Sequence, residues 1–148
     1  MCECLIRRMT EEDLPGILEI EQENLSVPWS ERSFRDMLCR KEMIYLAAER
    51  CGTREIVGYA GGSAAGEEGD VINIAVRGSE KQKGTGTALL ARLIEEMRSA
   101  GVREFFLEVR EHNVPALRLY KASGFVPVGR RKGYYDMPRE DALIMKKM

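Results

Sequence analysis

Apolar residues recur along the chain with two periods, one typical of strands and one typical of helices. Short runs rich in β-branched and aromatic residues predict strands at residues 4–9, 43–50, 56–63, 71–76, 104–109, 125–135 and 142–148. Apolar residues spaced three and four apart predict helices that follow Thr10, Ser30, Gly86 and Asn113. The pattern therefore predicts an α/β fold with a mixed sheet of about seven strands and about four helices.

The connections between these strands indicate how the sheet is arranged. Residues 51–53 form a short turn, so we expect the strands at 43–50 and 56–63 to pair as an antiparallel hairpin. A predicted helix joins the strands at 71–76 and 104–109, which indicates a parallel crossover. Because the run 71–76 is continuously apolar, we expect burial on both faces and a central position in the sheet.

Polar stretches and proline mark the remaining boundaries. Residues 64–70, with their glycine and glutamate, predict a loop, and residues 138–141 predict a turn between the last two strands. Pro28 interrupts the pattern between the first two helices. Since there are no repeats or linkers, and the length suits one core, we expect residues 1–148 to form a single domain.

One stretch has an order that binds phosphate: an apolar strand, a glycine loop and a helix. The loop ends in Gly84-Thr85-Gly86, and Lys81 and Lys83 add positive charge beside it. Glycine lets the backbone approach an anion closely, and the first turn of a helix offers N–H groups at the positive end of the helix dipole. A flexible turn before a helix is the alternative interpretation.

Two common phosphate motifs are excluded at this loop. A Walker loop ends in Gly-Lys-Ser/Thr, whereas the order here is Lys83-Gly84-Thr85. A dinucleotide fingerprint requires a third glycine where Leu89 stands. On these residues alone, the ligand of the loop stays open.

Composition and charge limit the class of function. The net charge is −1, with 44% hydrophobic and 32% charged residues, so we expect no general attraction to nucleic acid or membranes. No apolar run approaches the roughly 20 residues of a membrane span. The apolar part of the N-terminus is too short for a secretory signal. We therefore expect a cytoplasmic protein.

The cysteines give no sign of a disulfide framework or a metal site. Cys2, Cys4, Cys39 and Cys51 contain no Cys-x-x-Cys pair, and without an export signal we interpret them as reduced thiols. The only histidine, His112, is far from them in sequence. We therefore expect no bound metal.

Several segments together resemble the GNAT superfamily of acetyl-CoA-dependent N-acetyltransferases. They are residues 71–90, Leu107-Glu108-Val109-Arg110, Asn113, the Leu-Tyr-x-x-x-Gly-Phe of 119–125, Arg130-Arg131, Tyr134-Tyr135 and Glu140-Asp141-Ala142. Within the superfamily the chain is most similar to the RimI type, which acetylates the N-terminal alanine of a small-subunit ribosomal protein. The resemblance implies a GNAT-like, mostly antiparallel sheet, acetyl-CoA as co-substrate and a protein N-terminus as partner.

The resemblance assigns the glycine loop to the pyrophosphate of the coenzyme. The family pattern is Gln/Arg-x-x-Gly-x-Gly/Ala, and Lys81 in its first position keeps a charge but lacks the fork geometry of arginine. The backbone of 74–76 is expected beside the pantetheine arm and thioester, with Ile74 and Val76 side chains in the core. The coenzyme-binding residues implied are Ile74, Ala75, Val76, Lys81, Gln82, Lys83, Gly84, Thr85, Gly86, Thr87, Asn113 and Tyr120.

Glu108 and Tyr120 match the general base and general acid of the RimI type. An N-terminal amine is largely protonated at neutral pH and must lose a proton before attack, and the leaving thiolate is helped by a proton. By alternation Glu108 shares a strand face with Phe106, an unusual place for a carboxylate. The alternatives are an ion pair of Glu108 with Arg110 or Arg130, and a core-filling role for Tyr120.

The resemblance also implies residues that bind the acceptor. It places a basic and aromatic cluster along the peptide groove, namely Arg130, Arg131, Tyr134 and Tyr135. A charged edge strand that opposes aggregation is the alternative. Trp29, between the first two helices, either borders the acceptor pocket or packs in the core. Asn113 can also cap a helix, and His112 is expected to be a solvated loop residue.

Two other functions stay open. The same coenzyme could serve a small-amine acceptor, because the acidic residues of 66–70 would favour a cation. A non-catalytic acyl-CoA-binding module would bind the coenzyme without turnover, although the presence of Glu108 and Tyr120 argues against it. We expect no direct nucleic-acid or membrane partner, and a monomer or weak dimer.

Overall fold

The computed structural model describes residues 4–24, 29–81, 83–136 and 139–148. Within these residues the predicted mixed sheet is confirmed, with seven strands and four α-helices. The strands are β1 (Cys4–Arg8), β2 (Met43–Arg50), β3 (Ile56–Ala65), β4 (Glu68–Val76), β5 (Glu104–Arg110), β6 (Val126–Asp136) and β7 (Arg139–Lys147). The helices are α1 (Leu14–Asn24), α2 (Glu31–Leu38), α3 (Thr85–Ser99) and α4 (Val114–Ala122), with 3-10 turns η1 (Glu11–Asp13) and η2 (Gly78–Glu80).

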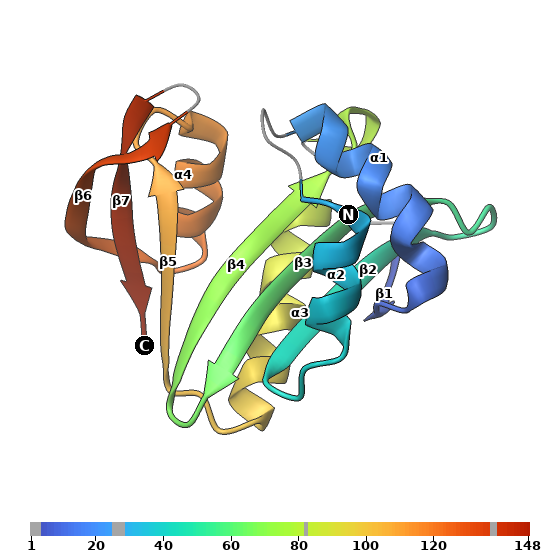
Figure 1. Cartoon of the computed structure of the whole chain (residues 1–148), viewed down its shortest axis with the longest axis horizontal. Coiled ribbons are helices and arrows are strands. Elements are labelled where there is room, and N and C mark those ends of the chain that lie inside the picture. The colour runs from blue at the N-terminus through green and yellow to red at the C-terminus, as the bar shows by residue number, and fades with distance from the viewer. Residues whose placement is uncertain (1–3, 25–28, 82, 137–138) are drawn as a thin grey trace.

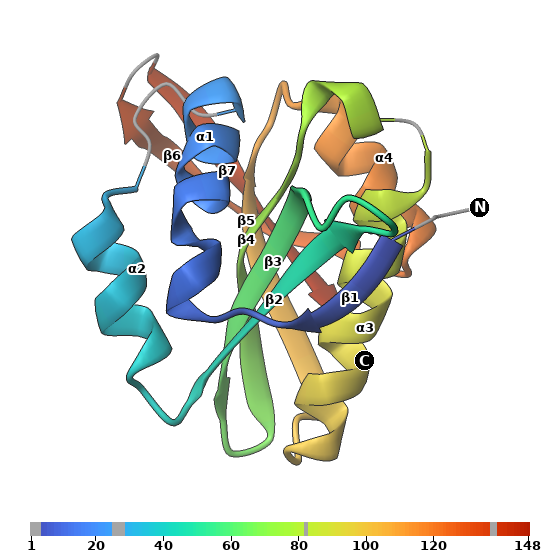
Figure 2. The same ribbon diagram turned by 90° about the vertical axis from the view of Figure 1, so that its right-hand side faces the viewer.

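The sheet has the strand order β1-β2-β3-β4-β5-β7-β6. The predicted hairpin of β2 and β3 is antiparallel, and β4 and β5 on either side of α3 are parallel, so both expected connections are confirmed. Helices α1 and α2 lie on one face of the sheet, and α3 and α4 lie on the other (Figures 1 and 2). The remaining neighbouring strands pair antiparallel.

Each face of the sheet buries its own core. On the α3 and α4 side, Leu89, Leu93 and Phe105 are fully buried. On the α1 and α2 side, Ile17 and Phe34 are fully buried against β2 and β3 residues. Apolar burial of this kind contributes roughly 25 cal/mol per Å², so these two layers hold the sheet between its helices.

The helix starts follow the capping residues of the sequence. Ser30 accepts a hydrogen bond from the Ser33 N–H at 3.2 Å, and Asn113 accepts one from the Ala116 N–H at 3.2 Å. These side chains satisfy N–H groups that the first helical turn leaves without a partner. The Asn113 side chain therefore has the structural role that the sequence offered as an alternative.

Strands β4 and β5 pair over only a short part of their length. Their ladder joins residues 68–70 to residues 104–106, whereas β3–β4 and β5–β7 pair over most of their lengths. Beyond Asp70 and Phe106 the two parallel strands diverge, as Figure 1 shows. The sheet thus opens between its two halves, next to the carboxyl ends of β4 and β5.

A β-bulge at Ile72 changes which face β4 presents. Gly61 pairs with Asn73 and Gly62 with Val71, so Ile72 is the extra residue. Before the bulge Val71 packs in the α3-side core; after it, Ala75 packs on the α1 side. Bulges of this kind re-aim side chains and occur often beside active sites.

Three local predictions were wrong. The run 71–76 is central but not buried on both faces, because the α1-side layer leaves Ile72 38% exposed. Most of the predicted loop 64–70 belongs to β3 and β4, since Gly66, with its φ of +65°, permits a two-residue turn. Of the predicted turn, residues 139–141 belong to β7, where they pair with β6, and Pro138 lies outside the described residues, as does Pro28.

Candidate active site

The glycine loop has the geometry expected of an anion site. Gly84 has a φ of +85°, a left-handed conformation that favours glycine, and it is the N-cap of α3. The first intrahelical bond runs from the Ala88 N–H to the Gly84 carbonyl at 3.0 Å. Thr85, Gly86 and Thr87 form the first turn, whose N–H groups are the ones that an α-helix leaves without intrahelical acceptors.

The lysines beside this loop differ in their surroundings. Lys81 is exposed, and Lys83 is 61% exposed with its Nζ 3.7 Å from a carboxylate oxygen of Glu80. Gln82, also predicted to bind the coenzyme, lies outside the described residues. Both described lysines therefore carry an exposed positive charge just before the helix start.

The C-terminal part of β4 runs from the bulge towards this loop. Ile74 and Val76 are half-buried and pack against the α3-side core, as predicted, and Ala75 packs on the other side. This part of β4 lies beyond its short ladder with β5. Its backbone borders the opening of the sheet, where the pantetheine arm was predicted.

Glu108 lies on β5, the strand that borders the opening of the sheet. Figure 1 shows that α1 and α2 do not cover this strand. Phe105, Leu107 and Val109 face the α3-side core, so Glu108 points to the other face, which confirms the alternation. Its side chain is 33% exposed, and its Oε2 lies 2.8 Å from Nε of Arg131. An ion pair was the structural alternative, but its partner is neither Arg110 nor Arg130.

The alternation of β6 decides which arginine reaches Glu108. Arg131 pairs with Ala142, which pairs with Arg110, so Arg131 lies on the same face as Glu108 and Arg130 lies on the other. Arg130 turns to the carboxylates of Glu111 and Asp141. The two adjacent arginines therefore serve different partners, and only Arg131 reaches Glu108.

Tyr120 comes from the other face of the sheet. It lies in α4, is 8% exposed and packs edge-on against Phe125 with ring centroids 5.9 Å apart. Burial, followed by the charge of Tyr135, raises the pKa of Tyr120 above its ordinary value. The phenol therefore keeps its proton at neutral pH, as a proton donor must.

Tyr135 connects the two predicted catalytic residues. Burial, followed by the charge of Glu108, raises the pKa of Tyr135 to about 12. The charge of Tyr135 in turn contributes to the raised pKa of Tyr120. The guanidinium of Arg110 lies 4.3 Å above the Tyr135 ring, and the Tyr134 ring is 5.1 Å away.

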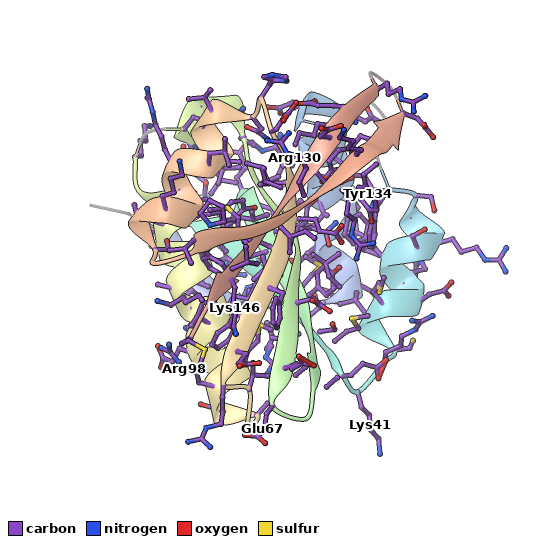
Figure 3. The ribbon with its side chains drawn as sticks, turned by 90° about the vertical axis from the view of Figure 1, so that its left-hand side faces the viewer. Lys41, Glu67, Arg98, Arg130, Tyr134 and Lys146 are labelled. Atoms are coloured by element: carbon purple, nitrogen blue, oxygen red, sulfur yellow. The ribbon has the colours of Figure 1, made fainter. Side chains whose placement is uncertain are left out.

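Tyr134 belongs to the same side of the sheet. It is half-exposed, and Figure 3 shows it on the side of β6 that faces α2, whereas Arg130 lies towards the end of the sheet. Arg131 lies over the Tyr134 ring at 5.7 Å. The predicted acceptor residues Arg131, Tyr134 and Tyr135 therefore gather around Glu108, and Arg130 does not join them.

His112 and Glu140 border this group. His112 is 81% exposed, as expected of a solvated loop residue, and its N–H and Nδ1 lie 2.7 and 3.0 Å from Glu140. Glu140 also pairs with Arg110 at 3.3 Å. The His112 N–H bond and Arg110 lower the pKa of Glu140 although burial opposes them. Glu140 thereby fixes the arginine that covers Tyr135.

The surroundings of Trp29 are compatible with both roles expected for it, at the border of the acceptor pocket and in the core. It is half-buried, and its ring lies 5.6 Å from that of Phe34. The backbone N–H of Trp29 donates to Oε2 of Glu21 at 2.8 Å. Glu21 is fully buried, and its Oε1 has no hydrogen-bond partner among the described residues. Burial raises the pKa of this carboxyl, although the Trp29 N–H works against the change.

Sequence reasoning missed these buried polar groups. Besides Glu21, they include Glu80 before the glycine loop, and Tyr45, whose hydroxyl donates to Asn73 Oδ1 at 2.6 Å. Asn73 stands alone among apolar residues in 71–76, and this exception could have indicated that one strand face has a polar task. The pairing of Arg131 with Glu108 had no comparable signal.

Glu67, in the β3–β4 turn, is remote from this group. It pairs with Arg103 at 3.5 Å, and Figure 3 shows it at the opposite end of the sheet from Arg130 and Tyr134. Asp70 lies nearer, since it pairs with Phe106, two residues before Glu108. None of the described helices is long and apolar enough to cross a membrane. The described cysteines, Cys4, Cys39 and Cys51, form no disulfide with one another, and Cys2 lies outside the described residues.

Comparison with known proteins assigns a family to this arrangement. Residues 14–125 match the model of the acetyltransferase (GNAT) family. The [ribosomal protein bS18]-alanine N-acetyltransferase of Escherichia coli K12 is 36% identical over 90% of this chain and 89% of its own length. The enzyme of that name from Haemophilus ducreyi is 33% identical over 95% of this chain and 97% of its own. The crystal structure of the E. coli ribosomal-protein-S18-alanine N-acetyltransferase superimposes with a TM-score of 0.87, at 33% identity, over 97% of this chain and 92% of that one.

Proposed function

Because the chain belongs to the GNAT family of acetyltransferases, we propose that it transfers the acetyl group of acetyl-CoA to the α-amine of a protein N-terminus. The proposed acceptor is the N-terminal alanine of ribosomal protein bS18, the substrate in the names of its relatives. Those relatives match about nine-tenths of the chain. The observation that carries the proposal in the molecule is the opening of the sheet between β4 and β5, with the left-handed Gly84 at the start of α3 after β4 and Glu108 paired with Arg131 on β5.

In this proposal the coenzyme lies between the two halves of the sheet. Its pyrophosphate binds the backbone N–H groups of the first turn of α3, assisted by Lys81 and Lys83. Its pantetheine arm follows the backbone of residues 74–76, whose N–H groups can polarise the thioester carbonyl. The geometry of Gly84 and the short β4–β5 ladder support this placement.

In the proposed reaction the base, Glu108, and the acid, Tyr120, come from opposite faces of the sheet. Glu108 accepts one proton from the N-terminal ammonium and releases it to solvent, and the neutral nitrogen attacks the thioester carbonyl carbon. A C–N bond forms and the C–S bond breaks. Tyr120 gives its proton to the departing thiolate, and the second proton from the nitrogen restores the phenol. Transfer is direct, with no covalent enzyme intermediate.

Arg131 affects the first of these steps. Its ion pair with Glu108 is made by the charged carboxylate, which is the form that accepts a proton. An incoming ammonium group has to share or replace this partner. Both side chains are partly exposed, so the exchange costs little, about 0–1 kcal/mol for a pair of this kind.

Mass spectrometry tests the proposal directly. The chain is incubated with acetyl-CoA and a peptide that carries the N-terminal sequence of bS18, either with a free N-terminus or with a blocked one. We expect a mass increase of one acetyl group on the free peptide alone. Acetylation of a small polyamine but of neither peptide would instead indicate a small-amine acceptor, and coenzyme binding without any product would indicate a non-catalytic module.

A further inference from the structure

The turn that leads from β4 into the glycine loop carries a buried carboxylate. Glu80 directly precedes Lys81, and only 6% of its surface is exposed. The Lys83 N–H donates to the Glu80 carbonyl at 3.4 Å, so this residue is part of the loop's own framework. A phosphate at the loop would meet a negative charge in a place from which water is largely excluded, where like charges repel strongly.

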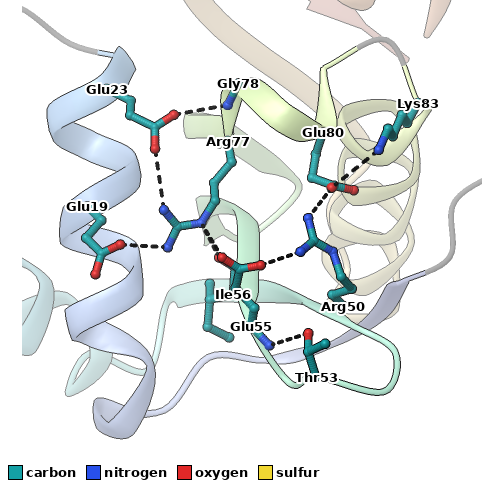
Figure 4. Close-up of polar contacts among 10 residues, drawn as sticks. All are labelled: Glu19, Glu23, Arg50, Thr53, Glu55, Ile56, Arg77, Gly78, Glu80 and Lys83. Atoms are coloured by element: carbon teal, nitrogen blue, oxygen red, sulfur yellow. Dashed lines mark hydrogen bonds and ion pairs between the residues drawn. The ribbon is translucent and has the colours of Figure 1, made fainter.

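Arg50, at the end of β2, compensates this charge. Its Nη2 donates to Oε2 of Glu80, and its Nη1 donates to Glu55 at the start of β3 (Figure 4). The Glu80 hydrogen bond, followed by the charges of both carboxylates, raises the pKa of Arg50. Lys83 touches the same oxygen of Glu80 only weakly, with 3.7 Å between Nζ and Oε2.

The other end of the turn is fixed in a similar way. The Arg77 side chain is 13% exposed, donates to the Ile56 carbonyl at 2.8 Å and pairs with Glu19 of α1 at 3.1 Å. The Gly78 N–H donates to Glu23 at 3.0 Å. Figure 4 shows these contacts continuing through Glu55 to Arg50. The turn is therefore held by α1 and β3 at its start and by β2 at its end.

We infer that Arg50 is a positioning residue for coenzyme binding: it neutralises Glu80 and thereby leaves Lys83 available to pair with the pyrophosphate. The inference rests on the proposed function only in taking CoA as the ligand of the loop. Lys83 is exposed and loosely paired, so it exchanges carboxylate for phosphate at little cost. Arg50 is held by two carboxylates and stays with Glu80.

Calorimetric titration of the full chain with CoA, without any acceptor, tests this role. In Arg50→Gln the buried Glu80 loses its main partner, and we expect CoA to bind about tenfold more weakly or worse. In the double variant Arg50→Gln/Glu80→Gln both charges are gone, and we expect the affinity to return to within about threefold of wild type. A contact that only supports the fold would leave the double variant as weak as the single one.

Arg54→Gln is the matched control, because Arg54 is exposed in the same β2–β3 connection and its loss changes the net charge equally. We expect it to bind CoA like wild type. Thermal melts establish that each variant is folded; should Arg50→Gln not fold, Glu80→Gln alone decides, with affinity equal to or tighter than wild type expected.

Undiminished affinity in Arg50→Gln, no rescue in the double variant, or a tenfold loss in Glu80→Gln would overturn the inference. A wild-type chain that bound no CoA would overturn the proposed function together with it. Normal CoA binding without rescue would overturn the role of Arg50 alone.

Discussion

The glycine loop and the proposed acceptor segment of β6 are built from different chemistry. The loop, in its described residues 83–87, presents backbone N–H groups at the left-handed Gly84 and follows the ion pair of Arg50 with the buried Glu80. The proposed acceptor segment, residues 130–135, presents side chains on a bulged edge strand, with Tyr134 half-exposed. A backbone site depends on conformation, whereas a side-chain site depends on the identity of each residue.

Because of this difference, separate substitutions should affect coenzyme binding and acceptor chemistry. Changes that strain the loop should weaken CoA binding without altering the acid–base groups. Changes at Glu108 should do the reverse, since Glu108 lies on a regular part of β5 and its partner Arg131 comes from another strand. The experiments below test the comparison in order of expected effect.

Glu108→Gln should have the largest effect. The amide has nearly the same shape but cannot accept the proton of the incoming ammonium, so we expect kcat/KM for the acceptor peptide to fall by about 10²–10⁴-fold at neutral pH. CoA affinity should be unchanged. Steady-state kinetics and calorimetric titration measure the two quantities on the same preparation.

Glu104→Gln is the control for this substitution. Glu104 lies on the same strand and, by alternation, on the same face, but at the opposite end of β5, where it pairs with Lys146 at 3.3 Å. We expect wild-type turnover from it. Full turnover in Glu108→Gln would show that another group removes the proton.

Gly84→Ala should have a smaller effect, confined to the coenzyme. A non-glycine residue at a φ of +85° is strained by about 1–2 kcal/mol. Relief of this strain moves the N–H groups of the first turn of α3, so we expect CoA to bind about three- to thirtyfold more weakly. Turnover at saturating acetyl-CoA should stay near wild type, as kinetics at varied coenzyme concentration would reveal.

Gly66→Ala is its counterpart in the β3–β4 turn. Gly66 has a φ of +65°, and an added Cβ would meet no atom within 4 Å at either glycine. Both variants should therefore lose similar thermal stability, but only Gly84→Ala should lose coenzyme affinity. Equal losses of affinity would mean that the loop responds to general destabilisation and not to its own geometry.

Glu21→Gln should have the smallest effect, and that effect should be a gain in thermal stability, whereas Glu108→Gln and Gly84→Ala should cause losses. Burial raises the pKa of Glu21 above its ordinary 4.5, so above the folded pKa its ionised form costs stability. As pH falls through the folded pKa towards 4.5, the folded state takes up the proton first and this cost disappears. We therefore expect Glu21→Gln to raise Tm at pH 8 by about 3 °C for each kcal/mol, and to lose that advantage at lower pH.

Glu12→Gln provides the exposed control, and melts between pH 4.5 and 8 compare the two variants. In Glu21→Gln the amide oxygen of the new side chain can still accept the Trp29 N–H, so the acceptor side should keep its shape. A Tm difference that did not change with pH would indicate a packing effect and contradict the role of ionisation.

Residues with local signals could be predicted from the sequence. The alternation of Phe105, Leu107 and Val109 gave the orientation of Glu108, and Gly84 before an amphipathic helix gave the left-handed helix start that an anion site would need. The resemblance to the GNAT superfamily and its RimI type is confirmed by the family match and the relatives. The roles of the individual residues in binding and catalysis stay predictions.

Features set by pairing between strands could not be predicted. The bulge at Ile72 depends on how β4 meets Gly61 and Gly62, and the pairing of Arg131 with Glu108 depends on the register of β6 against β7 and of β7 against β5. The burial of Glu80 depends on Arg50, which is 30 residues away in sequence. No local pattern encodes such distant partners, because each one is a property of two segments together.

The bulge at Ile72 makes β4 respond differently to the loss and to the gain of a residue. Without Ile72, Asn73 would follow Val71 directly in regular alternation, so its deletion leaves Asn73 beside Tyr45 and keeps Ile74 and Val76 in the α3-side core. One residue inserted between Ile72 and Asn73 would instead turn Asn73 and Ala75 towards α3 and move Ile74 and Val76 out of their core. Deletion of Ile72 should therefore be tolerated better among functional variants than insertion of a residue beside it.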